Sequence, residues 1–272
     1  LKVLFYLCRC QLLNLAQYAD LFPKVILHII EGICYSADYC RLSFSDATQL
    51  LPHDRPFVAK NSIDSGGGKG VRFYDPTMNK ITIDDIIKTH GNNVVLQEEE
   101  KQHPWFERFN KDSINTIRVT TYRSIRDEKV NVLQMLFRIG KKGSKVDNQS
   151  SGGIACGIDD SGKLNTWGCD KLSNKFHEIN GIQLSELNII PDIELVKSTC
   201  IEIAKKRFYE RVLVFDTWRD QTNKIRLTEI NNVNIGIEDL QKNNGPLLGA
   251  YTEEVVNWCA SKPRSFSFDF LL

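Results

Sequence analysis

The chain lacks the features that mark several classes of protein. No apolar run in its 272 residues approaches the roughly 18 residues of a membrane-spanning helix. Its eight cysteines form no CxxC pair and no zinc spacing with histidine, so we expect reduced thiols and a cytoplasmic location. Thirty-five basic residues against thirty-four acidic ones leave a net charge of +1, which predicts no nucleic-acid partner.

The hydrophobic pattern predicts an α+β fold. Residues 1–35 carry apolar side chains at helical spacing on both sides of Pro23, which predicts two helices that meet there. Core packing is the favoured role of this segment, and contact with a membrane surface is the alternative. Strands are predicted at 56–60, 71–74, 94–98, 114–122, 129–138 and 153–158, and helices at 83–89, 193–209 and 252–261.

Residues 211–234 form the most informative stretch. Two apolar runs flank the polar segment 219–224, which predicts a β-hairpin. With the turn centred on residues 222 and 223, Asp216 lies opposite Glu229, and Asn231 shares the face of Glu229. Because two buried carboxylates repel each other, we expect Mg²⁺ or Mn²⁺ to bind between these oxygen ligands. The alternative is an acidic pair at a solvated sheet edge.

A glycine-rich loop follows a short strand in FVAKNSIDSGGGKGVRFYD, residues 57–75. The strand ends near Lys60, and residues 65–70, here called the glycine loop, contain four glycines. Consecutive glycines let backbone N–H groups approach a phosphate, and Lys60 adds a positive charge. The segment is not a Walker A motif, because glycine follows Lys69. A flexible hairpin tip is the alternative interpretation.

A buried arginine and a polar strand end complete the candidate residues. Arg118 lies within the apolar run 117–119, so its guanidinium must be paired or bind an anion. A transferring phosphoryl group and a structural ion pair are both suitable partners. Gln97 and Glu98 end an apolar strand whose backbone can be presented to an adenine edge.

The order of these parts resembles the ATP-grasp superfamily. More narrowly, it resembles the sugar-transfer-associated ATP-grasp family, which is found with capsule and exopolysaccharide genes. The matching segments are FVAKNSIDSGGGKGV, QEEEKQHPWFERFNKDSINTIRVTTYR, FRIGKKGSKVDNQSSGGIACGID and LVFDTWRDQTNKIRLTEINNVN. The resemblance covers roughly residues 55–260. It implies two α+β subdomains that clasp ATP between them: a lid subdomain over 51–101 and a catalytic subdomain over 102–272. A helical segment over 1–50 would precede them.

The resemblance also implies roles for particular residues. Arg118 would contact the γ-phosphate or the reaction intermediate, and Gln97 and Glu98 would flank the adenine. The phosphate-binding residues would be Lys60, Ser65, Gly66, Gly67, Gly68 and Gly70. The metal ligands would be Asp216, Glu229 and Asn231, and the acceptor side would include Arg138, Asp147 and Asn148.

The implied activity is an ATP- and Mg²⁺-dependent ligation of a carboxylate to an amine through an acylphosphate. In this family it would join an amine donor to a sugar acid or polysaccharide acceptor during surface-polysaccharide biosynthesis. One alternative is a kinase that phosphorylates a hydroxyl of a sugar. Another is a non-catalytic nucleotide-binding subunit of a glycan assembly complex, against which the intact metal triad argues.

Overall fold

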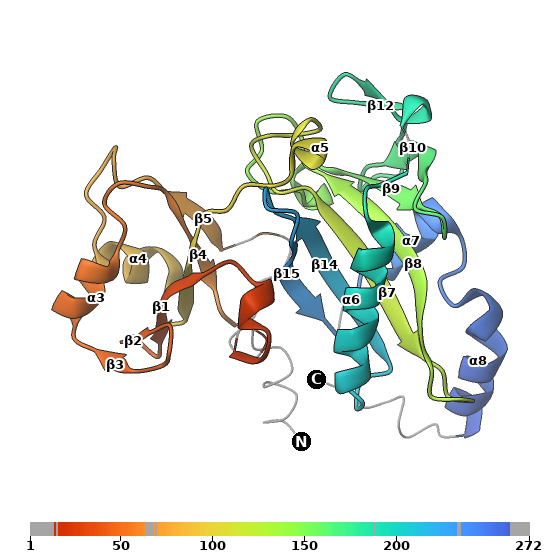
Figure 1. Cartoon of the computed structure of the whole chain (residues 1–272), viewed down its shortest axis with the longest axis horizontal. Helices are drawn as coiled ribbons and strands as arrows, with labels where there is room; N and C mark the ends of the chain where they lie inside the picture. Colours follow the sequence, from red (N-terminus) through yellow and green to blue (C-terminus); the bar gives the residue numbers. More distant parts are fainter. Residues whose placement is uncertain are drawn as a thin grey trace.

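Two antiparallel sheets, joined by short connections and covered by helices, make up the protein (Figure 1). The structure is a computed structural model that describes residues 14, 16–63, 68, 70–187, 189–232 and 235–261. Ser65, Gly66 and Gly67 of the glycine loop lie outside the described residues, as does most of the first predicted helix. The predicted α+β class is confirmed. Among the described residues, no helix is long and apolar enough to cross a membrane.

The first sheet contains six strands in the order β3-β2-β1-β6-β4-β5. The strands are β1 (Val25–Ile30), β2 (Ile33–Ser36), β3 (Arg41–Leu42), β4 (Phe57–Asn61), β5 (Val71–Tyr74) and β6 (Val94–Glu98). Helices α3 (Phe44–Leu50) and α4 (Ile83–His90) contribute Ala47 and Ile86 to the apolar core of this sheet. A capping box between Thr82 and Asp85 begins α4, and Gly91 at φ +83° ends it, which explains the sharp helix boundaries.

The predicted second helix is wrong, because Val25–Ile30 is strand β1. Ile30 pairs with Ile33 across the two-residue turn Glu31–Gly32, whose φ angles are +51° and +77°. Such positive angles define the tight hairpin turn that matches strand twist. These residues form a short β-branched run between a proline and a turn. In a run this short, the spacing of apolar residues alone does not distinguish a helix from a strand. The three-part division of the chain stays a prediction, although one sheet joins strands from both sides of residue 50.

The second sheet contains seven strands in the order β11-β10-β9-β8-β7-β14-β15. They are β7 (Thr116–Arg123), β8 (Val130–Ile139), β9 (Ile154–Ile158), β10 (Leu164–Cys169), β11 (Lys175–Phe176), β14 (Val212–Arg219) and β15 (Ile225–Asn231). A small hairpin, β12 (Glu178–Ile179) and β13 (Ile182–Gln183), lies beside it. The remaining helices are α5 (Pro104–Glu107), α6 (Ile193–Lys206), α7 (Ile237–Asn244) and α8 (Thr252–Ser261), with 3-10 turns η1 (Ala19–Leu21), η2 (Gln149–Ser151), η3 (Leu184–Glu186) and η4 (Gly249–Tyr251).

The alternation of side chains along the second sheet determines which residues face the functional site. Helix α6 covers one face of this sheet (Figure 1). Phe137 and Phe215 point to that face and join the main apolar core, together with Val196 and Cys200 of the helix. Leu136 points the other way and packs with Leu240 of α7. Because successive strand residues face opposite sides, Thr116 and Arg118 of β7, Arg138 of β8 and Asp216 of β14 lie on the face opposite α6.

Candidate functional site

A cavity of about 1020 Å³ separates the two sheets and is lined by side chains from both. It collects nearly all the described site residues that the sequence predicts: Lys60, Gly68, Gln97, Glu98, Arg118, Arg138, Asp147, Asn148, Asp216, Glu229 and Asn231. Gly70 does not line the cavity; its carbonyl oxygen accepts a hydrogen bond from the Asn61 N–H at 3.2 Å. The cavity is therefore the candidate site.

The predicted pairing of Asp216 with Glu229 across the β14–β15 hairpin is confirmed. Closer to the turn the pairing is shifted by one residue, so that Thr217 pairs with Leu227 and the predicted register is wrong there. A bulge at Thr228 accommodates the shift, since it places one additional residue on β15. The bulge keeps the two carboxylates opposite each other while the turn closes one residue earlier.

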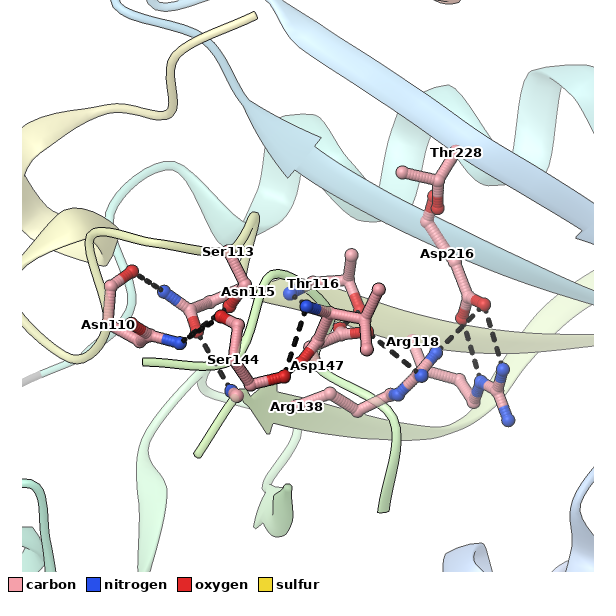
Figure 2. Close-up of polar contacts among 12 residues, drawn as sticks. Asn110, Ser113, Asn115, Thr116, Arg118, Arg138, Ser144, Asp147, Asp216 and Thr228 are labelled. Atoms are coloured by element: carbon pink, nitrogen blue, oxygen red, sulfur yellow. Dashed lines mark hydrogen bonds and ion pairs between the residues drawn. The ribbon is translucent and has the colours of Figure 1, made fainter. Parts of the chain in front are cut away.

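Two arginines hold the Asp216 carboxylate (Figure 2). Arg118 donates from Nε to Oδ1 at 2.7 Å and from Nη2 to Oδ2 at 2.8 Å, a two-point contact. Arg138 donates from Nη1 to Oδ2 at 2.9 Å. All three side chains come from neighbouring strands of the second sheet, since β7 lies between β8 and β14.

The charges in this group compensate one another. Burial pushes the pKa of Asp216 upward, but the charges of Arg118 and Arg138 outweigh it and lower this pKa to about 2. Burial opposes the charged form of Arg118 as well, and Asp216 more than offsets that by raising the pKa of the guanidinium. Arg118 and Arg138 thus compensate the Asp216 charge within the protein itself, and the role of Asp216 as a metal ligand stays a prediction. The structural ion pair that the sequence leaves open for Arg118 is present.

Arg138 continues the network to Asp147, as Figure 2 shows. Its Nη2 donates to Asp147 Oδ1 at 3.0 Å, while the other carboxylate oxygen accepts hydrogen bonds from the backbone N–H and the hydroxyl of Thr116. Burial raises the pKa of Asp147, and the charge of Arg138 opposes that effect. Thr116 is a site residue that the sequence analysis missed; its place two residues before Arg118, on the same strand face, is the signal that identifies it.

Glu229 and Asn231 form the part of the site best suited to a divalent cation. Burial, and next the charge of Asp216, raise the pKa of Glu229, while a hydrogen bond with Asn231 lowers it. Carboxylate and amide oxygens are ligands that Mg²⁺ accepts. No cluster of three or more His, Cys, Asp and Glu side chains suited to a metal occurs within the described part of the chain. The donor set fits a cation held by Glu229 and Asn231, with Asp216 across the hairpin.

Lys60 is a half-buried cation of the first sheet. It ends in the same cavity, and no hydrogen bond or ion pair joins its ammonium group to another described residue. Burial lowers its pKa to about 8, although the charges of Glu229 and Glu100 oppose the shift. An ammonium group held in this way favours an anionic ligand, because an anion compensates the loss of hydration.

The strand end at Gln97 and Glu98 lies at the far part of the cavity. Gln97 is fully buried and donates from Nε2 to the Pro23 carbonyl at 2.9 Å, but its Oε1 has no partner among the described residues. The indole N–H of Trp218 is likewise buried and unpartnered in that part of the chain. Glu98 instead forms ion pairs with Lys24 and Arg55. The predictions missed Trp218, although it follows Asp216 on the same strand face.

The two atoms are an unpaired acceptor and an unpaired donor among the described residues. Adenine carries an amino group that donates and ring nitrogens that accept, so it has the types of group that such atoms can bind. With the lysine and glycine loop on one sheet and the carboxylate hairpin on the other, the fold and site define an ATP-grasp protein.

The comparison with protein families assigns the chain to one family. The family described as sugar-transfer associated ATP-grasp matches residues 50–256. Because the match spans well over half of the chain, the chain belongs to the sugar-transfer-associated ATP-grasp family. A search of curated proteins finds no match.

Solved structures confirm the fold. D-alanyl-alanine synthetase A from Vibrio cholerae O1 biovar eltor str. N16961 is 12% identical with a TM-score of 0.52, and the match covers 94% of this chain and 65% of that one. D-Alanine-D-Alanine ligase from Helicobacter pylori is 11% identical with a TM-score of 0.52, over 92% and 58%. The ATP-grasp ligase PsnB, solved with its precursor peptide PsnA2 and AMPPNP, is 13% identical with a TM-score of 0.50, over 91% and 58%. This chain spans less than two thirds of the length of each.

Proposed function

We propose that this protein is an ATP- and Mg²⁺-dependent ligase that joins a carboxylate to an amine. The acceptor would be a sugar acid or a polysaccharide carboxylate, in keeping with the sugar-transfer association of the family. The observation that carries the proposal is a single cavity in which Lys60 of one sheet faces the Arg118–Asp216–Glu229 group of the other. PsnB, with a similar fold, was solved with an ATP analogue and a peptide, which supports a nucleotide and an acceptor in such a site.

The reaction consists of two displacements. A carboxylate oxygen of the acceptor attacks the γ-phosphorus of ATP, the bond to ADP breaks, and an acylphosphate forms. The amine nitrogen then attacks the acyl carbon, phosphate leaves with the bonding electron pair, and the amine loses a proton. Neither step needs a nucleophile from the protein, so positioning and charge stabilisation supply the catalysis.

The residues of this chain supply those two effects. Lys60 places a positive charge beside the phosphate chain, and the glycine loop offers backbone N–H groups. Arg118 is oriented by Asp216 through two hydrogen bonds, so its remaining nitrogen, Nη1, has a fixed position. Gly236, at φ +72°, lies close to that nitrogen, since a Cβ atom there would be 3.0 Å from it. A guanidinium fixed in advance stabilises developing phosphoryl charge without reorganisation.

The metal ion would be held by Glu229 and Asn231, with Asp216 nearby. When bound, Mg²⁺ neutralises phosphate charge and draws electrons from the transferring phosphoryl group. Manganese accepts the same oxygen ligands and is expected to substitute.

Hydroxylamine trapping tests the reaction type. The protein is incubated with ATP, Mg²⁺, hydroxylamine and oligosaccharides that contain uronic acids. An acylphosphate yields a hydroxamate, with ADP and free phosphate released in equal amounts, and that is the expected result. ADP formation with phosphate retained on the oligosaccharide would contradict the proposal and establish a sugar kinase. A protein that binds ATP but never turns it over would instead be a nucleotide-binding subunit.

A further inference from the structure

The segment from Gly140 to Gly153, which follows strand β8, is tied to the second sheet by hydrogen bonds. Asn115 Oδ1 accepts from the Gly140 N–H at 3.1 Å. Asn110 donates from Nδ2 to the carbonyl oxygens of Lys141 and Ser144, both at 3.1 Å (Figure 2). We call residues 140–153 the anchored loop, because the buried amides of Asn110 and Asn115 hold its first part.

Asp147 attaches the middle of the anchored loop to the catalytic face. Its carboxylate binds Arg138 on one side and Thr116 on the other, and the side chain is almost fully buried. At Gly153, an added Cβ would lie only 2.4 Å from the Asp147 carbonyl oxygen, so the loop closes tightly around this residue. The position of the loop is therefore coupled to the guanidinium that also holds Asp216.

Asn148, the next residue, reaches the glycine loop of the first sheet. A Cβ atom added to Gly68 would lie 2.4 Å from Asn148 Oδ1, 3.2 Å from its Cγ and 3.6 Å from the Val146 Cβ. At under 3.0 Å one of the two groups must move, so Gly68 packs directly on the Asn148 amide, which is the end of a side chain. Gly68 also has φ +74°, a backbone conformation that glycine adopts without strain.

A second contact joins the same two regions. Lys145 Nζ lies 5.3 Å from the ring centroid of Phe73 on β5 and 3.9 Å from Glu99 Oε1, beyond the end of β6. Both partners belong to the first-sheet side of the cavity, and both also line it. The anchored loop thus meets the first sheet at two separate points.

We propose that Asn148 is a positioning residue, which seats Gly68 while Asp147 fixes Asn148 to Arg138 and Thr116. The inference rests on the proposed function, since it concerns how phosphate-binding backbone is placed over the site. It assigns Asn148 a role different from the acceptor contact that the family resemblance implies. A displaced Asn148 would let Gly68 shift relative to Arg118 and Asp216, and nucleotide affinity would fall.

A double-mutant cycle on the full chain tests this role, with MgADP as the probe and calorimetry as the measurement. Gly68→Ala is expected to weaken MgADP binding at least about tenfold, because the new methyl group overlaps Asn148. Asn148→Ala alone is expected to weaken it about threefold. In the double variant the methyl group has room, so MgADP is expected to bind more tightly than to Gly68→Ala. Backbone strain at residue 68 is the same in both and cancels from the comparison.

Gly181→Ala is the matched control. Gly181 has φ +87°, but an added Cβ there meets nothing within 4 Å, so this variant reports backbone strain without a clash. Its MgADP affinity is expected to equal that of the unmutated protein, and the melting temperature of every variant shows whether it folds. Additive losses in the double variant would overturn the inference alone. Failure of the unmutated protein to bind MgADP would overturn the proposed function together with the inference.

Discussion

The two walls of the cavity solve the problem of buried charge in different ways. On the second sheet, Arg118 and Arg138 are paired with Asp216 and Asp147 by hydrogen bonds of 2.7–3.0 Å. On the first sheet, Lys60 has no such partner among the described residues, and burial lowers its pKa to about 8. Folding alone therefore orients Arg118 and Arg138, whereas Lys60 carries a charge that a ligand must compensate.

The largest effect on the unfolding free energy is expected where the ion pairs of Asp216 are broken. Asp216→Asn removes the charge that two guanidinium groups share, and breaking a buried ion pair costs about 3–5 kcal/mol of unfolding free energy. Urea denaturation at neutral pH measures the loss. Turnover is expected to vanish as well, because Arg118 loses its two-point contact. Unchanged stability would show that the arginines do not depend on Asp216.

Acid denaturation gives a control for the same residue. The pKa of Asp216 is lowered to about 2 in the folded protein, so its stabilising contribution is present above the unfolded value of 3.8. That contribution is lost as pH falls from about 4 to 2, since the carboxylate must then be protonated. In Asp216→Asn this part of the pH dependence is expected to disappear.

Nucleotide binding tests whether Lys60 contacts the phosphates of ATP. ATP with Mg²⁺ at a hundredfold excess over Kd is expected to stabilise the protein by about 2.7 kcal/mol. In a chain of this size that is roughly a 5–10 °C rise in melting temperature. GTP is expected to do less, and Lys60→Ala is expected to remove most of the rise without lowering the stability of the protein alone. Full retention of the shift in this variant would place the phosphates elsewhere.

The pH dependence of ATP affinity sharpens the comparison further. The pKa of Lys60 is about 8 in the protein alone, and bound phosphates favour its charged form. Below pH 8 the affinity is expected to be nearly constant. Above it, the affinity is expected to fall about tenfold per pH unit, which is about 1.4 kcal/mol, as the ammonium loses its proton. Lys60→Arg, which stays charged, is the control and should flatten the profile.

The smallest effect on the unfolding free energy is expected at Glu229. Burial and the Asp216 charge both raise its pKa, so Glu229→Gln removes an unfavourable charge. The unfolding free energy is expected to change by less than about 1 kcal/mol, and in the stabilising direction. ATP turnover is expected to be lost, because an amide holds Mg²⁺ poorly. Near-normal ATP consumption in this variant would make the hairpin a purely structural feature.

The sequence predicts those parts that follow from strand alternation and short motifs. The pairing of Asp216 with Glu229 follows from two apolar runs around one turn, and strands β5 and β6 have the predicted bounds. The sequence analysis predicts a helix where strand β1 lies, because an apolar run this short is compatible with either structure. The signal that identifies it is the two-residue turn Glu31–Gly32.

The network around Asp216 could not be predicted from sequence spacing. Arg118, Arg138 and Asp147 lie on separate segments, and their contact depends on the strand order β8-β7-β14 and on the loop after β8. No local pattern encodes that order. The contact of Gly68 with Asn148 is of the same kind, because it joins the two sheets across the cavity.

A crystal structure of the protein with Mg²⁺ and AMPPNP tests the central claim most directly. The account predicts the base near Gln97 and Trp218, and the phosphates between Lys60 and Arg118. It also predicts a metal ion on Glu229 and Asn231, while Asp216 keeps its contacts with Arg118. A nucleotide bound outside this cavity, or phosphates that never approach Lys60, would contradict the account.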